Sequence, residues 1–201
     1  DLIEKRIVKE SCETLLPFHD IYKATFDSYK SERLDASLEL FVIFAEKNGY
    51  ITKSKKFSVL IDIGKECLWK YRKEASTYRD ELHKNAEYFS ALEIAKMIKK
   101  CNKKNVTDYD TEDCQNQFVL ANCIKYTCSY EKANKEFEQI KTVYESTRNR
   151  EILGIYLESQ TEIVNTNIWM LNIKESFSIL NELKSVFEEL YTNQQIVGHH
   201  L

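Results

Sequence analysis

The sequence predicts an all-α globular protein with roughly seven to nine helices. Only four glycines and one proline occur among 201 residues, whereas strand-rich chains of this size need many turns and build them from these residue types. Charged residues make up 30% of the chain, and Leu, Ile, Lys and Glu are abundant, which is typical of helical proteins. The length is enough to bury one core, so we expect residues 1–201 to form a single domain.

Three helices are predicted at the N-terminal end of the chain. Apolar residues on one face predict a helix over residues 1–16, and Pro17 ends it. A short second helix is expected around residues 21–29. The third runs from about Leu34 to Asn48 and is apolar almost all round, as a buried helix is, and Gly49 is well placed to cap it.

The middle of the chain predicts a polar turn over residues 53–56, a helix over 57–72 and another over about 78–100. Residues 102–111 are the clearest loop, rich in Asn, Asp, Lys and Thr. This loop contains Asn105-Val106-Thr107, a sequon at which a secreted chain can be glycosylated. Asp110 or Thr111 is expected to cap the next helix.

Helical character continues to the C-terminus, with breaks near Cys128, near 147–150 and around 165–172. The last segment has the best amphipathic pattern in the chain, because its apolar residues step by four, three, three, four and three positions. These residues are Ile173, Phe177, Leu180, Leu183, Phe187 and Leu190. The pattern spans fewer than three heptads, so we expect a core-packing helix with Leu183 and Phe187 buried, and no coiled coil.

Six cysteines bear most directly on the compartment of the protein, and they are Cys12, Cys67, Cys101, Cys114, Cys123 and Cys128. An even number is typical of a disulfide framework, and predicts a secreted, extracellular protein with three bridges. Buried free thiols in a cytosolic protein are the alternative. A metal site does not fit, because there is no C-x2-C pair and no histidine except His19 lies within ten residues of a cysteine.

Charge and motifs exclude several classes of function. The net charge is −3 and no basic stripe is present, so no nucleic-acid partner is expected. No apolar run approaches the length of a membrane span. The chain lacks a phosphate-binding loop, H-E-x-x-H and G-x-S-x-G, so we predict a non-enzyme without cofactor or metal. We also expect the protein to be a monomer. Basic clusters at 53–56 and 99–104 are either solvated turns or sites for an acidic partner such as heparin or a nucleotide.

The segment IKKCNKKNVTDYDTEDCQNQFVLANC resembles the insect odorant-binding protein superfamily. That family places one cysteine at a helix end and two more, separated by eight residues, on the next helix. The segment EKNGYITKSKKF resembles the family's turn after its third helix, with Gly49 and Phe57 in the expected places, and Cys12 takes the first-cysteine position. The resemblance covers residues 1–125 and leaves 126–201 as additional C-terminal helices.

The resemblance implies a Cys101–Cys123 bridge. The family's second and third cysteines would fall near Glu39 and Ile43, which are not cysteines, so Cys67 becomes the natural partner of Cys12. Cys114 is then left with Cys128. These two cannot meet if one straight helix joins them, because 14 residues of helix rise about 21 Å.

Salivary members of this superfamily from blood-feeding insects bind biogenic amines or eicosanoids, so the resemblance implies a small amphipathic ligand in a cavity between the helices of residues 34–123. The aromatic residues expected to line it are Phe41, Phe44, Trp69, Tyr71, Tyr78, Tyr88 and Phe89. Glu112 or Asp113 would neutralise an amine. The simpler interpretations are ordinary core for the aromatic residues and charges facing a helix N-terminus for the two acids.

A second class of function is a secreted helical interaction protein that binds a host macromolecule, such as a receptor, a complement component or a clotting factor. Amphipathic helices suit such surfaces, and no small-molecule pocket is needed. The two hypotheses differ in the interior that they require: a closed apolar cavity favours the ligand carrier, and a solid core favours the interaction protein.

Overall fold

The computed structural model describes residues 32–102 and 104–192, and within them every regular element is helical. This confirms the all-α prediction. The elements are α2 (Glu32–Lys47), α3 (Lys53–Ile63), α4 (Lys65–Lys70), α5 (Arg72–Lys84), α6 (Tyr88–Cys101), the 3-10 turn η1 (Val106–Asp108), α7 (Thr111–Thr127), α8 (Tyr130–Thr147), α9 (Arg150–Trp169) and α10 (Ile173–Thr192). The predicted helices over 1–16 and 21–29 lie outside the described residues.

Several predicted boundaries agree with the structure. Asp110 caps α7 through a reciprocal pair of hydrogen bonds with Asp113, so that each carboxylate accepts the other residue's backbone N–H. The predicted breaks near 128 and 147–150 separate α7 from α8 and α8 from α9. Gly49 has a positive φ of 74° after α2, a conformation that glycine adopts without strain.

Three predicted elements differ from the structure. Residues 53–56 are the first turn of α3, because the Thr52 hydroxyl accepts the Lys55 N–H and caps a helix there. The predicted helix over 57–72 is interrupted at Gly64, whose backbone is extended, and again at Tyr71. The predicted helix over 78–100 is divided by a turn in which Ala86 takes a left-handed φ of 61°.

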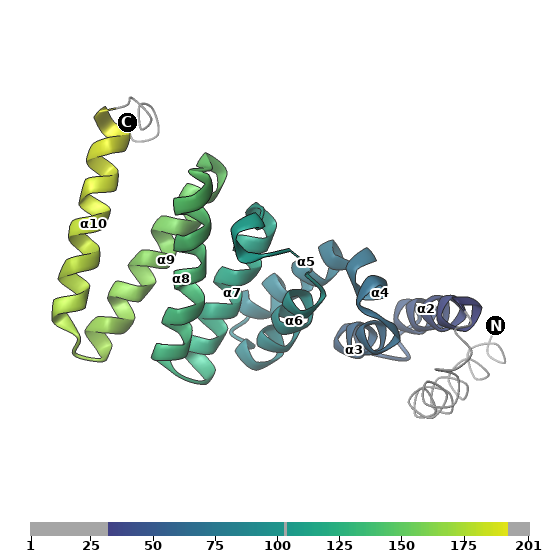
Figure 1. Cartoon of the computed structure of the whole chain (residues 1–201). Helices are drawn as coiled ribbons and strands as arrows, with labels where there is room; N and C mark the ends of the chain where they lie inside the picture. The colour runs from purple at the N-terminus through teal and green to yellow at the C-terminus, as the bar shows by residue number, and fades with distance from the viewer. Residues whose placement is uncertain (1–31, 103, 193–201) are drawn as a thin grey trace, which may run out of the picture.

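The helices lie side by side in one extended row, with α2 at one end and α10 at the other (Figure 1). From α5 onwards each helix packs on its neighbours in sequence, and α7 also contacts α5 and α9. Short turns join successive helices after α7, so these neighbours are antiparallel. The arrangement is that of a helical-hairpin array, in which each helix completes the apolar core of the next.

The core extends along this row as one connected cluster. Its largest fully buried apolar side chains are Phe57, Leu60, Leu68, Ile94, Phe137, Ile140 and Ile152. The predicted division at 125/126 falls inside α7, and buried residues on both sides of it belong to this cluster. Among the described residues the central helices are therefore covered on two sides, whereas a helix at the end of the row has a described neighbour on one side only.

The end position of α10 decides which part of its apolar stripe is buried. Leu183 and Leu190 face α9 and are 7% exposed, which confirms the prediction for Leu183. Phe187 is 47% exposed, so the prediction that it is buried was wrong. The stripe is wider than the contact with α9, and no described helix lies beyond α10 in the row.

Candidate functional site

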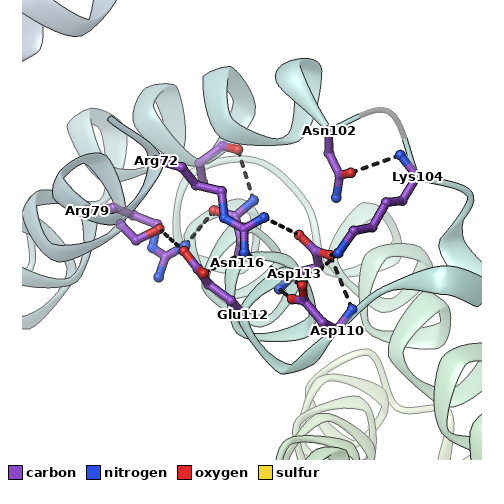
Figure 2. A network of polar contacts seen from close by, with 10 residues as sticks. Arg72, Arg79, Asn102, Lys104, Asp110, Glu112, Asp113 and Asn116 are labelled. Carbon is purple, nitrogen blue, oxygen red and sulfur yellow. Dashed lines mark hydrogen bonds and ion pairs between the residues drawn. The ribbon is translucent and has the colours of Figure 1, made fainter. Parts of the chain in front are cut away.

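Glu112 and Asp113, the acids predicted to meet a ligand amine, lie in an ion-pair network at the start of α7 (Figure 2). The Arg72 guanidinium on α5 pairs with the Glu112 carboxylate and lies 3.5 Å from Asp113 Oδ1. Lys104 Nζ lies 2.8 Å from Asp113 Oδ2 and 2.6 Å from Asp110 Oδ2. Both predicted acids therefore already have cationic partners within the chain.

The network also fixes the charge of its members. The Arg72 hydrogen bond lowers the pKa of Glu112, and the same bond raises the pKa of Arg72. Partial burial alone would raise the pKa of Asp110, but hydrogen bonds from Lys104 and from the Asp113 N–H bring it down to about 2. At neutral pH Arg72, Glu112 and Asp110 are ionised, so their ion pairs hold residues 104–110 on α5 and α7.

A second cation of α5 is buried about two helical turns beyond Arg72. Arg79 is 1% exposed, and its Nη1 donates to Asn116 Oδ1 while Nε and Nη2 donate to Asp80 Oδ1 at 3.0 and 2.8 Å. Asn116 Nδ2 in turn donates to the Ala95 carbonyl at 3.2 Å. This chain of bonds links α5, α6 and α7. The sequence carried a signal for it, because Arg79 occupies the position between buried Ala75 and Leu82 in the apolar face of α5.

The predicted aromatic residues near α3–α5 have separate neighbours. Tyr71 Oη donates to Glu39 Oε1 at 3.0 Å, and the Trp69 ring lies 4.4 Å from the Arg72 guanidinium. Tyr78 packs on Phe57 with a ring distance of 6.0 Å. These side chains connect helices, and Trp69 lines a hollow of about 220 Å3 on the surface. The other residues of that hollow are Lys65, Glu66, Cys101, Asn102 and Lys104.

The remaining predicted aromatic residues lie elsewhere. Phe41 is half-buried and Phe44 is exposed on α2, and Phe89 is exposed on α6. Tyr88 stacks on Tyr126 at the end of α7, with ring centroids 4.3 Å apart. Fourteen residues of α7 separate Tyr126 from Glu112, or about 21 Å. One small ligand therefore cannot touch both the Tyr88 pair and the predicted acids.

The structure corrects two predicted cysteine pairs. Cys114 and Cys128 lie at opposite ends of the unbroken helix α7, about 21 Å apart along its axis. Cys101 ends α6 and Cys123 lies near the end of α7, and these helices are antiparallel because Asn116 bonds to Ala95 while Tyr126 meets Tyr88. That register separates Cys101 and Cys123 by about 15–20 Å along the helices, well beyond the reach of a disulfide.

The same four cysteines are present as free thiols. Burial raises the pKa of Cys114 to about 12 and that of Cys123 to about 11, and it also raises the pKa of Cys101. These buried thiols stay protonated and unreactive at neutral pH. Cys128 is exposed. Cys12 lies outside the described residues, so its predicted pairing with Cys67 stays a prediction.

Asn105, the predicted glycosylation site, lies on the surface just before η1. Its side chain is exposed, and Nδ2 lies 3.3 Å from Asp108 Oδ2. The asparagine is therefore accessible to a modifying enzyme, and the modification itself stays a prediction.

A site that sequence reasoning missed lies where α7 and α9 end and α8 begins. Three aromatic side chains, Tyr126, Tyr130 and Trp169, are exposed there, and Trp169 is 75% exposed. They line a hollow of about 400 Å3, which we call the aromatic hollow. Its other residues are Lys125, Glu162, Asn165 and Thr166. The signal in the sequence was that Tyr126 and Tyr130 flank the predicted break near 128 and Trp169 lies within the one around 165–172, since a side chain at a helix end escapes coverage by the neighbouring helix.

The aromatic hollow has a fixed polar wall. Lys125 Nζ lies 2.7 Å from Glu162 Oε2 and 4.5 Å from the centre of the Tyr126 ring. Tyr126 is also backed by Tyr88, which packs edge-on against His83 at 5.5 Å. Burial lowers the pKa of His83, so the imidazole is neutral at pH 7. The Tyr126 ring and the ion pair are thus held in place by residues of α5, α6 and α9.

No protein-family model matches the chain, and no curated protein or solved structure matches it either. The resemblance to the odorant-binding superfamily therefore stays a prediction. None of the described helices combines the length and the apolar character that a membrane crossing needs. Over residues 32–102 and 104–192, no group of three or more His, Cys, Asp or Glu side chains is placed to hold a metal ion.

Proposed function

We propose that this protein is a helical interaction module that binds a segment of a protein partner in the aromatic hollow. The observation that carries the proposal is the exposure of Tyr126, Tyr130 and Trp169 around one concave surface of about 400 Å3. Tyr and Trp dominate the binding energy of protein interfaces, because they bury a large area and lose little side-chain entropy. A volume of this size accepts one or two partner side chains.

The polar wall specifies the chemistry of the partner segment. The aromatic faces suit an apolar or aromatic side chain, while the Asn165 amide and the Lys125–Glu162 ion pair suit the hydrogen-bonding groups of a peptide backbone. The wall contains one cation and one anion, so it favours neither an anionic nor a cationic ligand strongly. A neutral peptide with an apolar anchor residue fits these features best.

The small-ligand carrier receives less support. The predicted acids are paired with Arg72 and Lys104, and Phe89 and Tyr88 lie at the far end of α7 from them. Calorimetry against serotonin, histamine, noradrenaline and a thromboxane analogue should therefore show no heat. Submicromolar binding weakened by Glu112→Gln would restore the carrier hypothesis.

Selection of random peptides displayed on phage, with the full chain as target, tests the proposal. Peptides selected at the aromatic hollow should lose about 30- to 1,000-fold in affinity with Trp169→Ala, which corresponds to the 2–4 kcal/mol typical of an aromatic hot spot. Phe44→Ala on α2 is the matched control, because it removes an exposed aromatic ring elsewhere. Peptides that bind both variants equally would contradict the proposal.

Tryptophan fluorescence gives a second measurement of the same site. The chain has two tryptophans, and Trp69→Phe leaves Trp169 as the only one. Its emission should lie at the long wavelengths of a solvated indole and shift to shorter wavelength when a selected peptide covers it. An unshifted spectrum at saturating peptide would place the peptide elsewhere.

A further inference from the structure

The outer face of α10 is a second apolar surface, separate from the aromatic hollow. Four of its large apolar side chains are between 45% and 64% exposed, although the helix is otherwise well packed on α9. These are Ile173, Phe177, Leu180 and Phe187. A shallow groove of about 740 Å3 runs along its C-terminal half and includes Leu180, Leu183 and Phe187. The face belongs to α10, the helix at one end of the row of described helices (Figure 1).

We infer that this face pairs with the same face of a second copy of the chain, as two antiparallel α10 helices related by a twofold axis at Leu180. The spacing of the stripe is a palindrome about that residue. Ile173 and Phe187 lie seven residues from Leu180 on either side, and Phe177 and Leu183 lie three residues from it. A twofold antiparallel pair brings Ile173 beside Phe187 of the second copy and the two Leu180 side chains together, whereas Phe177 lies over the level of Leu183, which α9 already covers.

Charges on the free flank of α10 are symmetric about Asn181, one residue from the centre of the apolar stripe at Leu180. The flank towards α9 is identified by Ser176, whose Oγ donates to the Val164 carbonyl at 3.4 Å. The opposite flank carries Lys174, Asn181 and Glu188 at intervals of seven residues, which keeps them in line along the helix. In the antiparallel pair Lys174 lies beside Glu188 of the second copy, and the reverse pair forms as well.

The available area sets the strength of the contact. The four exposed side chains present apolar surface of about 400 Å2 per copy, on the basis of about 200 Å2 for a fully exposed large side chain. With the charged flank, a pair of copies buries about 1,000–1,200 Å2, at the lower end of specific interfaces. We therefore expect a reversible dimer in the micromolar range, in place of the monomer that the sequence led us to expect.

Residues 193–201 are a competing occupant, since they follow directly on Thr192, which lines the groove. They contribute Ile196, Val197 and Leu201 as apolar residues, and nothing in their spacing matches the palindrome of the stripe. The near-symmetric spacing of Ile173, Leu180 and Phe187, and of Lys174 and Glu188, favours a second α10. A truncation that removes these residues separates the two occupants.

Sedimentation equilibrium of the full chain from 1 to 300 µM should show a reversible change from the 23.8 kDa monomer to twice that mass. Phe177→Glu should weaken the dimer at least 30-fold without unfolding the chain, because the side chain is already exposed. Phe89→Glu, at an exposed position on α6, is the matched control and should leave the dimer unchanged.

Charge exchange tests the antiparallel register. Lys174→Glu and Glu188→Lys should each weaken the dimer about 3- to 10-fold, and the double variant should restore it, because the two residues face each other across the twofold axis. A wild-type chain that stays monomeric at 300 µM would overturn the inference. So would a double variant no better than either single one, or dimerisation that appears only after residues 193–201 are removed. Trp169→Ala should leave the dimer intact, so the inference and the proposed peptide site fail independently.

Discussion

Replacing Arg79 by methionine tests the buried polar link between α5, α6 and α7. Methionine matches the length and apolar stem of arginine but removes the guanidinium. Asn116 then loses the donor to its Oδ1, and since it is only 5% exposed no solvent replaces that donor. Asp80 is partly exposed and regains water. The structure thus assigns the main cost of the substitution to the stranded Asn116 carbonyl.

The expected loss of unfolding free energy in Arg79→Met is the difference between two opposing effects. An unsatisfied buried acceptor costs about 1–3 kcal/mol, and hydrogen bonds to a charged group contribute about 1.5–3 kcal/mol more. Removing the guanidinium also removes the penalty for burying a charge, which offsets part of this loss. We expect Arg79→Met to lower the free energy of unfolding by about 2–3 kcal/mol. Adding Asn116→Leu removes the stranded acceptor and should recover about 1–2 kcal/mol.

Urea denaturation followed by circular dichroism measures both changes as shifts of the midpoint at constant slope. Lys73→Met is the matched control, because it removes an exposed cation from the same helix and should change stability by less than about 0.5 kcal/mol. A loss below about 1 kcal/mol for Arg79→Met, or no recovery in the double variant, would refute the reasoning.

Three further predictions concern the thiols, α10 and acid stability. Native protein should show a fast-reacting thiol that disappears with Cys128→Ser, while Cys101, Cys114 and Cys123 react with Ellman's reagent only after unfolding. An intact mass that requires a disulfide among these four cysteines would instead support the disulfide framework and the secreted location. Leu183→Ala should lower the free energy of unfolding by about 2–5 kcal/mol and Phe187→Ala by about 1–2 kcal/mol, because only Leu183 is buried against α9. A larger loss for Phe187→Ala than for Leu183→Ala would mean that α10 packs on α9 through the other face. The pKa of Asp110 is lowered from 3.8 to about 2, so the unfolded chain binds more protons than the folded chain between these pH values. The stability that the ionised Asp110 carboxylate contributes is therefore complete above about pH 5 and is lost as the pH falls towards 2. It amounts to about 1 kcal/mol after allowing for exposure, and Asp110→Asn should flatten the acid slope of stability.

The sequence alone predicted those features that depend on neighbours a few residues apart. Asp110 caps α7 because its carboxylate reaches an N–H three residues later, and that geometry is local. The breaks near 128 and 147–150 likewise follow from short runs of poor helix formers. The turn at Ala86 was missed, because a left-handed alanine has no signature in composition and is stabilised by the packing of α5 on α6.

Which apolar and charged residues are covered was decided only by the tertiary structure. Leu183 and Phe187 belong to one stripe with one periodicity, yet the first packs on α9 and the second faces outwards, because α10 is the last described helix of the row. Glu112 and Asp113 had the composition of a ligand site, but Arg72 comes from a helix some forty residues earlier and neutralises them. The family resemblance implied candidate cysteine pairs, but the antiparallel packing of α6 on α7 separates Cys101 from Cys123, and the length of α7 separates Cys114 from Cys128. Periodicity thus determines the helices and their apolar faces, while the order of the helices in space determines which of these faces is left free to bind.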